Sequence, residues 1–217
     1  MILSFILFIG AVLFVLFFFR PSSSLDLVGS SSDFVFAQVE ERVETDVVRY
    51  GLQIVAPTLL VGLRLDTVPE GAGSRAVTER GLTVESGISG SLVSAQNPGV
   101  SFMTIEVSDA FPPGILSGVG DEAAVVISSS IAERVLSEKK LLLLNGTYHA
   151  GYETLKQDLQ ISPGLNFRFL TIFAGGDRVE GERDVPVGVE VFVKEQRREV
   201  IRLDGRREFA SLVVSIW

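Results

Sequence analysis

LNFRFLTIF, residues 165–173, is the clearest strand signal in this chain of 217 residues. Its apolar side chains recur along the run with the two-residue period of a half-buried strand. Towards the C-terminus, residues 187–193 alternate in the same way, and residues 198–203 lead through Asp204-Gly205 into an alternating run over 209–217. An Asp-Gly pair between two such runs is typical of a tight hairpin turn. The C-terminal part is therefore predicted to be β-structure.

Short apolar segments also fill the region after Gly51, and turn signals break them at the spacing expected of a sandwich or barrel. These signals are Gly71-Ala72-Gly73-Ser74, Gly87-Ile88-Ser89-Gly90, Asn97-Pro98-Gly99 and Pro112-Pro113-Gly114. The fold class predicted for residues 33–217 is therefore mainly β with some α, a β-sandwich-like domain. Whether it forms one or two β subdomains stays open.

Helical spacing indicates one or two helices in this domain. Asp33 suits an N-cap, and an apolar stripe follows it with charged residues on the other face, which predicts an amphipathic helix towards Tyr50. Ser130 and Glu133 match a capping box and predict a second helix that ends near Lys140. The stretch 141–144 and the residues from Tyr148 onward are predicted to return to strands.

The N-terminus carries an apolar run from Ile2 to Phe19, interrupted by Ser4 and Gly10. As a helix, eighteen residues span about 27 Å, close to the hydrocarbon thickness of a bilayer. We predict a transmembrane anchor over residues 1–20 and a serine-rich tether over 21–32, while a cleaved signal peptide is the alternative. The side chains expected in contact with lipid are Ile2, Phe5, Phe8, Val12, Leu16 and Phe19.

Charge and composition narrow the location and the partners. The chain has a net charge of −8 and no cysteine, which excludes disulfides and thiolate chemistry and makes nucleic acid a poor partner. Asn145-Gly146-Thr147 is a sequon, usable outside the cytoplasm, although an unmodified Asn-Gly turn explains it equally well. Arg20 alone argues weakly for the opposite orientation. We expect a single-pass membrane protein with its folded domain outside the cytoplasm.

The sequence offers little for catalysis, and neither an enzyme nor a cofactor is expected. His149 is the sole histidine, and Ser137 and Lys140 have a Ser-x-x-Lys spacing without its companion motifs. A calcium site is one hypothesis for the carboxylates between Gly175 and Asp184, with a solvated loop neutralised by its own arginines as the favoured alternative. The four candidate ligands are Asp177, Glu180, Glu182 and Asp184.

The order of these elements resembles archaeal type IV pilin-like surface proteins. The likeness rests on the apolar segment Ser4–Gly10, a serine-rich break, an amphipathic helix, and a β-rich domain that ends in Asp204-Gly205 and Ile216-Trp217. In that family the N-terminal helix anchors the subunit and packs in a filament core. Because Pro21 interrupts the helix that a major pilin would extend, the resemblance implies a minor or accessory component.

Three functions follow as hypotheses. A structural or assembly component of a surface filament or envelope would associate with itself, or with other pilin-like subunits, through Ile2 to Phe19. An anchored binding module would display loops such as Gly71 to Gly90 to a glycan or protein. An anchored hydrolase, the least favoured, would need a pocket near His149 or Ser137.

Overall fold

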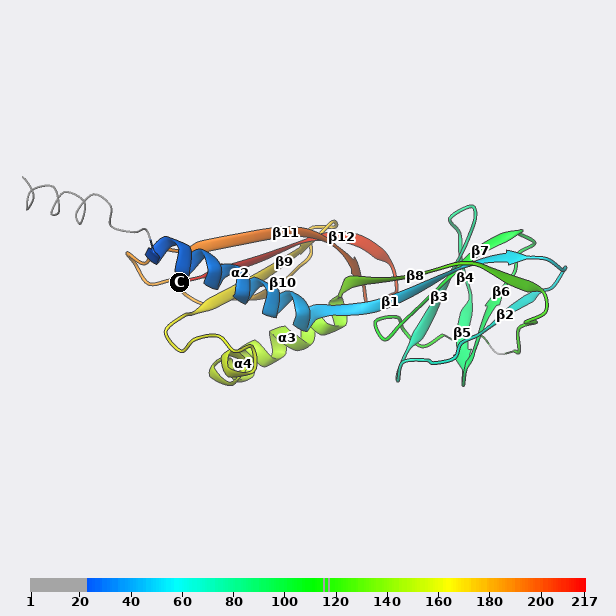
Figure 1. Ribbon diagram of the computed structural model, residues 1–217, viewed down its shortest axis with the longest axis horizontal. Coiled ribbons are helices and arrows are strands. Elements are labelled where there is room, and N and C mark those ends of the chain that lie inside the picture. Colours follow the sequence, from blue (N-terminus) through cyan, green and yellow to red (C-terminus); the bar gives the residue numbers. More distant parts are fainter. Residues whose placement is uncertain (1–22, 115, 117) are drawn as a thin grey trace, which may run out of the picture.

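The computed structural model describes residues 23–114, 116 and 118–217, and they form an elongated molecule with two lobes (Figure 1). The two longest strands, β1 (Glu44–Ile54) and β8 (Val125–Ser137), run through both lobes. The proximal lobe comprises α2 (Ser23–Val43), α3 (Glu138–Ala150), α4 (Tyr152–Asp158), β9 (Phe167–Phe173), β10 (Arg178–Gly181), β11 (Phe192–Ile201) and β12 (Arg207–Ile216). The distal lobe comprises β2 (Leu60–Arg64), β3 (Gly73–Thr78), β4 (Thr83–Val84), β5 (Ser86–Ser89), β6 (Leu92–Gln96) and β7 (Phe102–Ser108).

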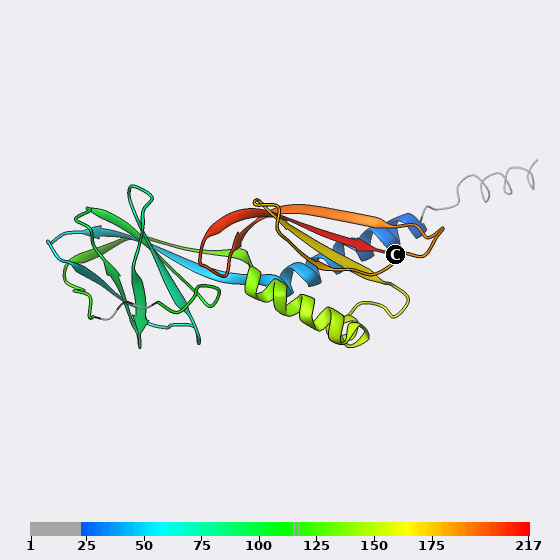
Figure 2. The same cartoon turned by 180° about the vertical axis from the view of Figure 1, so that it is seen from behind.

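A long curled sheet connects the lobes, which confirms the mainly β prediction. Its nine strands follow the order β10-β9-β12-β11-β8-β1-β7-β3-β4, and β2, β6 and β5 form a second sheet. The second sheet packs on the distal part of the first, because one core joins Leu52 and Ile105 of the long sheet to Val61 and Val93 of the small sheet. The sandwich arrangement therefore belongs to the distal lobe, while helices cover one face of the sheet in the proximal lobe (Figures 1 and 2).

The strands predicted near the C-terminus are confirmed with shifted bounds. β9 covers Phe167–Phe173, and β11 and β12 pair as an antiparallel hairpin around the Asp204-Gly205 turn. Gly205 has a φ of +80°, which glycine adopts without the steric penalty of a Cβ. Strand β11 begins at Phe192, so most of the alternating run 187–193 lies before it.

The amphipathic helix is present but is placed earlier than predicted. Helix α2 begins at Ser23, so the larger part of the predicted tether 21–32 is helical, and the helix ends at Val43 instead of continuing towards Tyr50. Val35, Val39 and Val43 of the predicted apolar stripe are buried, and so is Phe36 beside them. The prediction extended too far because Val47, the next valine of the stripe, is also buried. It lies in strand β1, where alternate residues face inward.

The second helix was predicted on the wrong residues. Strand β8 continues to Ser137, which caps α3 by accepting a hydrogen bond from the Lys140 N–H at 3.4 Å. The residues predicted as strands, 141–144 and those from Tyr148 to Asp158, lie in helices α3 and α4 apart from Gly151 between them. Leu141, Leu144 and Tyr148 are buried at helical spacing, a pattern that a run of four leucines hides.

Among the described residues, no helix combines the length and hydropathy needed to cross a bilayer. The predicted anchor residues between Ile2 and Phe19 lie outside the part of the chain that the structure describes.

Two tyrosines in the proximal core are buried and hydrogen-bonded, and we expect them to make the stability of the fold sensitive to high pH. Tyr148 Oη donates to the Phe167 carbonyl at 2.7 Å, and Tyr152 Oη accepts from the Phe167 N–H at 2.8 Å. Burial, followed by the proximity of Tyr152, raises the pKa of the Tyr148 phenol far above its usual value, and burial also raises the pKa of Tyr152. Above about pH 10 the unfolded chain therefore releases phenolic protons that the folded chain retains.

Because the unfolded state then binds fewer protons, we expect the free energy of unfolding to fall as the pH rises above about 10, by up to about 1.4 kcal/mol per pH unit for each tyrosine. The variant Tyr148→Phe should lose one tyrosine's share of this slope. Urea unfolding between pH 8 and pH 11 measures it. Equal slopes in the variant and the parent would contradict the assignment.

Candidate functional site

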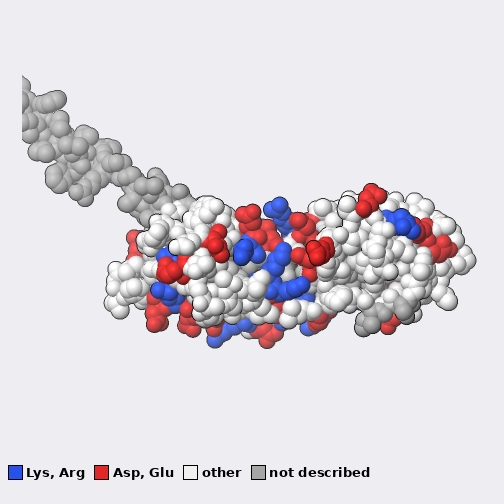
Figure 3. Space-filling view, turned by 90° about the horizontal axis from the view of Figure 1, so that it is seen from below, with Lys and Arg blue, Asp and Glu red and all other residues white. Residues whose placement is uncertain are grey.

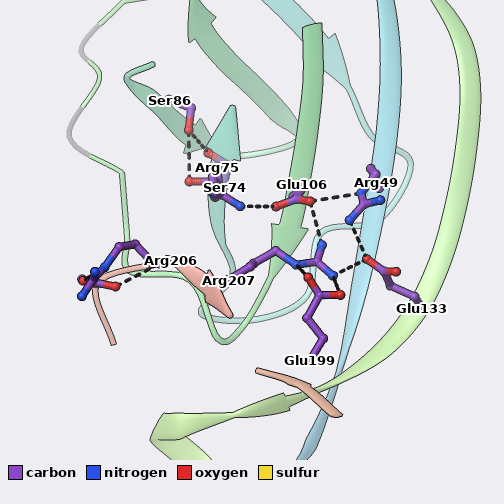
Figure 4. A network of polar contacts seen from close by, with 10 residues as sticks. Arg49, Ser74, Arg75, Ser86, Glu106, Glu133, Glu199, Arg206 and Arg207 are labelled. Carbon is purple, nitrogen blue, oxygen red and sulfur yellow. Dashed lines mark hydrogen bonds and ion pairs between the residues drawn. The ribbon is translucent and has the colours of Figure 1, made fainter. Parts of the chain in front are cut away.

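Six charged side chains from six strands meet where the two lobes join (Figure 4). We call this set the junction network. Its three arginines and three glutamates carry opposite formal charges in equal number. The members are Arg49 on β1, Arg75 on β3, Glu106 on β7, Glu133 on β8, Glu199 on β11 and Arg207 on β12.

Glu106 is the acidic centre of the junction network, with 5% of its side chain exposed. Its Oε1 accepts from Arg49 Nε at 3.0 Å and from Arg207 Nη1 at 2.7 Å, and its Oε2 accepts from Arg75 Nη1 at 3.2 Å. Strand register produces this arrangement, because Glu106 lies directly opposite Arg49 on one neighbouring strand and opposite Arg75 on the other. Such cross-strand pairs of opposite charge stabilise a sheet.

Arg207 is the basic centre and connects the lobes. It is 6% exposed, and its Nη2 lies 2.7 Å from carboxylate oxygens of both Glu133 and Glu199. Burial alone would lower the pKa of Arg207, but hydrogen bonds to Glu199, Glu133 and Glu106 more than offset it, so the pKa is raised above its ordinary value. Every carboxylate of the network is engaged by arginine, so the arrangement suits a structural brace between lobes rather than proton transfer.

A groove of about 420 Å³ lies beside the junction network. The apolar side chains of Val84, Phe111 and Pro112 line it, and the turn of the β11–β12 hairpin closes one side. A Cβ added to Gly205 would stand 3.4 Å from Pro112, so the turn packs closely against the distal lobe. The rim carries Arg206, whose Nε is 2.5 Å from Asp204 Oδ2.

The carboxylates predicted to bind calcium are not brought together. Asp177 Oδ2 lies 3.1 Å from Arg202 Nη2, and Glu180 Oε1 lies 3.4 Å from Arg178 Nε, so arginines neutralise these two acids. Within the described ranges, no group of three or more histidine or acidic side chains could hold a metal ion. For Asp177 and Glu180 the structure therefore favours the alternative of acids neutralised by arginine, whereas the part played by Glu182 and Asp184 stays a prediction.

The sequon lies inside a helix. Asn145 is in the middle of α3 with its Oδ1 buried, and Thr147 Oγ1 donates to the Leu143 carbonyl at 2.9 Å. The predicted Asn-Gly turn is therefore wrong. Glycosylation of Asn145 stays a prediction, in a setting unlike the surface loops that such acceptors usually occupy.

Ser137 and His149 lie near opposite ends of α3. Twelve residues of helix separate them by about 18 Å, so they do not form a catalytic pair. Ser137 acts as the helix cap, and Lys140 Nζ donates to the Glu44 carbonyl at 2.8 Å. Both members of the Ser-x-x-Lys pair thus have structural partners.

Comparison with known protein families, with characterised proteins and with solved structures found no match in any of the three.

Proposed function

We propose that this chain is a non-enzymatic, membrane-anchored extracytoplasmic protein, a pilin-like structural or assembly component of a cell-surface filament or envelope. The observation that supports the proposal is where the chain enters the folded body. Helix α2 begins at Ser23 at one tip of the elongated molecule, and the distal lobe forms the opposite tip (Figures 1 and 2). An anchor over residues 1–20 would therefore leave the distal lobe as the part farthest from the membrane.

The surface and the junction are consistent with a projecting body. On the face shown in Figure 3, charged side chains gather over the proximal lobe and the junction, whereas the distal lobe displays few of them. The junction network braces the lobes against each other through pairs such as Arg207–Glu106 at 2.7 Å. A braced body whose distal lobe shows few charged side chains on this face fits a component that contacts other proteins at a distance from its anchor.

Membrane extraction of the full chain tests the anchor. We expect the protein to stay with membranes at alkaline pH, and the double variant Phe8→Asp/Leu16→Lys to be released, since a charge at the centre of a spanning helix costs about 3 kcal/mol. A Phe102→Asp/Leu82→Lys variant, with two charges at exposed positions of the distal lobe, is the matched control. Release of the parent chain would overturn the anchor.

The side of the membrane and the assembly state need two further measurements. The chain has no cysteine, so Ser89→Cys in the distal lobe and Ser162→Cys in the proximal lobe give unique labelling sites at exposed residues. Both should react with a membrane-impermeant maleimide in intact cells. Electron microscopy of the native membrane fraction should show filaments or defined oligomers that require residues 2–19, and dispersed monomers would overturn the pilin-like assignment.

The groove beside the junction network favours a second function, an anchored binding module for a glycan or protein. Thr83 and Val84, from the loop region predicted to display such a surface, line the groove. A glycan array probed with the full chain would test it. Binding that the groove-filling variant Val84→Trp abolishes would support this function, and equal binding by both proteins would oppose it.

A further inference from the structure

Strand β8 has a long unpaired edge that runs from the junction into the distal lobe. Its residues pair with β1 on one side from Val125 to Leu136. On the other side, β11 joins at Leu136 and Ser137, and no other described strand pairs with β8 there. The seven residues from Val126 to Ala132 are exposed, so the free backbone N–H and C=O groups of this edge are accessible from solvent.

The edge lacks two of the devices that usually protect such strands, charged side chains and prolines. Charged residues and prolines are absent from Val125 to Ala132, although sheet proteins normally place them on exposed edges to prevent pairing with other chains. Instead the strand carries Val126, Ile127 and Ile131 with 52%, 51% and 56% of their surface exposed. An uncharged edge of this kind fits an uncharged strand of β-forming residues.

A β-bulge makes the edge complementary to itself. The register with β1 shifts at Gly51/Leu52, so that Ser128 is the extra residue. A Cβ added to Gly51 would stand 2.5 Å from Ser129 Oγ and 3.0 Å from Ser128 Oγ. Both serines therefore lie on one face of the sheet. As a result, residues at equal distances before Ser128 and after Ser129 lie on the same face as each other.

The pairing with β1 assigns the remaining residues of β8 to their faces. Val126 and Ile131 lie opposite Gln53 and Arg49, on the face of the two serines. The other face carries Val125, Ile127, Ser130 and Ala132. A two-fold rotation about an axis that passes between Ser128 and Ser129, perpendicular to the sheet, therefore places each residue of β8 opposite a residue of the same face.

We propose that two copies of this chain pair through β8, antiparallel, about a two-fold axis between Ser128 and Ser129. Antiparallel pairing across a two-fold axis is a closed, isologous contact that uses the same edge of both copies. It places Val126 opposite Ile131 of the second copy, Ile127 opposite Ser130, and Val125 opposite Ala132. The long sheet then continues from one copy into the other.

Cysteine pairs test this register in the full chain in detergent. Val126→Cys and Ile131→Cys, on separately tagged chains, should form a disulfide when the two are mixed. Each variant alone should form little, because its own cysteines would be about 17 Å apart at 3.3 Å per residue. Equal cross-linking in the mixture and in the single variants, or none in any sample, would overturn the proposal.

A charge on the edge gives an independent test. Ile131→Lys should raise the dissociation constant of the dimer at least tenfold in light scattering, the equivalent of about 1.4 kcal/mol. Phe102→Lys is the matched control, since Phe102 is 49% exposed and lies opposite Gln53 on the same face, but on β7, away from the edge. Equal dissociation constants for both variants would contradict pairing through β8.

The direction of the pairing has a consequence that rests on the proposed anchor. Strand β8 runs along the long axis of the molecule (Figure 1), so antiparallel copies have their α2 tips at opposite ends. Anchored copies would then join two opposed membranes. Phosphatidylcholine vesicles that carry the full chain should cluster, and those that carry Ile131→Lys should cluster less.

Flotation of the protein with the vesicles tests the membrane anchor separately from the pairing through β8. Protein that does not float would overturn the anchor and leave the β8 pairing to the cysteine test. Vesicles that hold the protein but do not cluster would overturn the arrangement across two membranes.

Discussion

Replacing Arg207 by methionine is expected to lower the free energy of unfolding by about 3–5 kcal/mol, the usual cost of removing one partner from a buried ion pair. Arg207 is 6% exposed and contacts Glu106, Glu133 and Glu199 within 2.7 Å. Methionine has a similar length and fills much of the same space. The loss would therefore report the three carboxylates left without their shared cation.

Urea unfolding of the full chain in detergent measures this effect, and the neighbouring arginine supplies the control. Arg206 lies on the same hairpin, but 76% of its side chain is exposed, and it pairs with Asp204 within the turn. Arg206→Met should change the free energy of unfolding by no more than about 0.5 kcal/mol. Similar losses for the two variants would show that the junction network does not carry the stability that its burial implies.

A second variant shows whether the charges act together. Glu106→Gln alone leaves three arginines facing two carboxylates, whereas Glu106→Gln combined with Arg207→Met leaves two of each. The double variant should therefore be more stable than the sum of the single losses predicts, by about 1 kcal/mol or more. Hydrogen exchange should show faster opening of the contact between the β11–β12 turn and Pro112 in Arg207→Met, because the network braces that contact.

The sequence correctly predicted those elements in which the spacing of apolar and polar residues fits only one kind of secondary structure. Strand β9 alternates between buried residues such as Phe167 and Phe169 and exposed ones such as Arg168, so its sequence carries the two-residue period directly. The Asp204-Gly205 turn was equally readable, because Gly205 has the positive φ that such turns require.

The pattern failed where two periods fit the same residues. Leucines fill positions 141–144, and such a run is compatible with a strand or with a helix. In the structure, burial of Leu141, Leu144 and Tyr148 identifies the inner face of a helix. Strand β8 was missed over most of its length because its centre is exposed on both faces, which removes the alternation on which strand prediction depends. Serine and glutamate in that stretch instead matched a capping box.

The junction network could not be predicted from the sequence. Its members come from six strands between Arg49 and Arg207, and their proximity depends on sheet register. Each charge, taken alone, matches the polar face of an exposed strand. A weak signal did exist in the alternation of Arg75, Val77 and Ala76 on β3, which places the arginine on the face opposite the core, but it does not indicate a partner.

Replacing Gly120 by alanine is expected to lower the free energy of unfolding by about 3 kcal/mol, which is at the upper end of what overpacking costs. A Cβ on Gly120 would stand 2.1 Å from the Val61 carbonyl oxygen and 2.6 Å from the Gly62 nitrogen, and both contacts are with backbone. Hydrogen bonds from Asp121 N to Leu60 O at 3.0 Å and from Gly62 N to Asp121 O at 3.1 Å hold the two segments at this separation.

The expected consequence is local, because these contacts join the small sheet of the distal lobe to the segment that leads into β8. Gly146→Ala is the matched control: a Cβ there meets nothing within 4 Å, and in the middle of α3 alanine should stabilise by about 1 kcal/mol. Thermal unfolding of both variants should therefore shift in opposite directions. A Gly120→Ala protein as stable as the parent would mean that the close approach of β2 to residue 120 relaxes without cost, and the packing of the small sheet would then not depend on it.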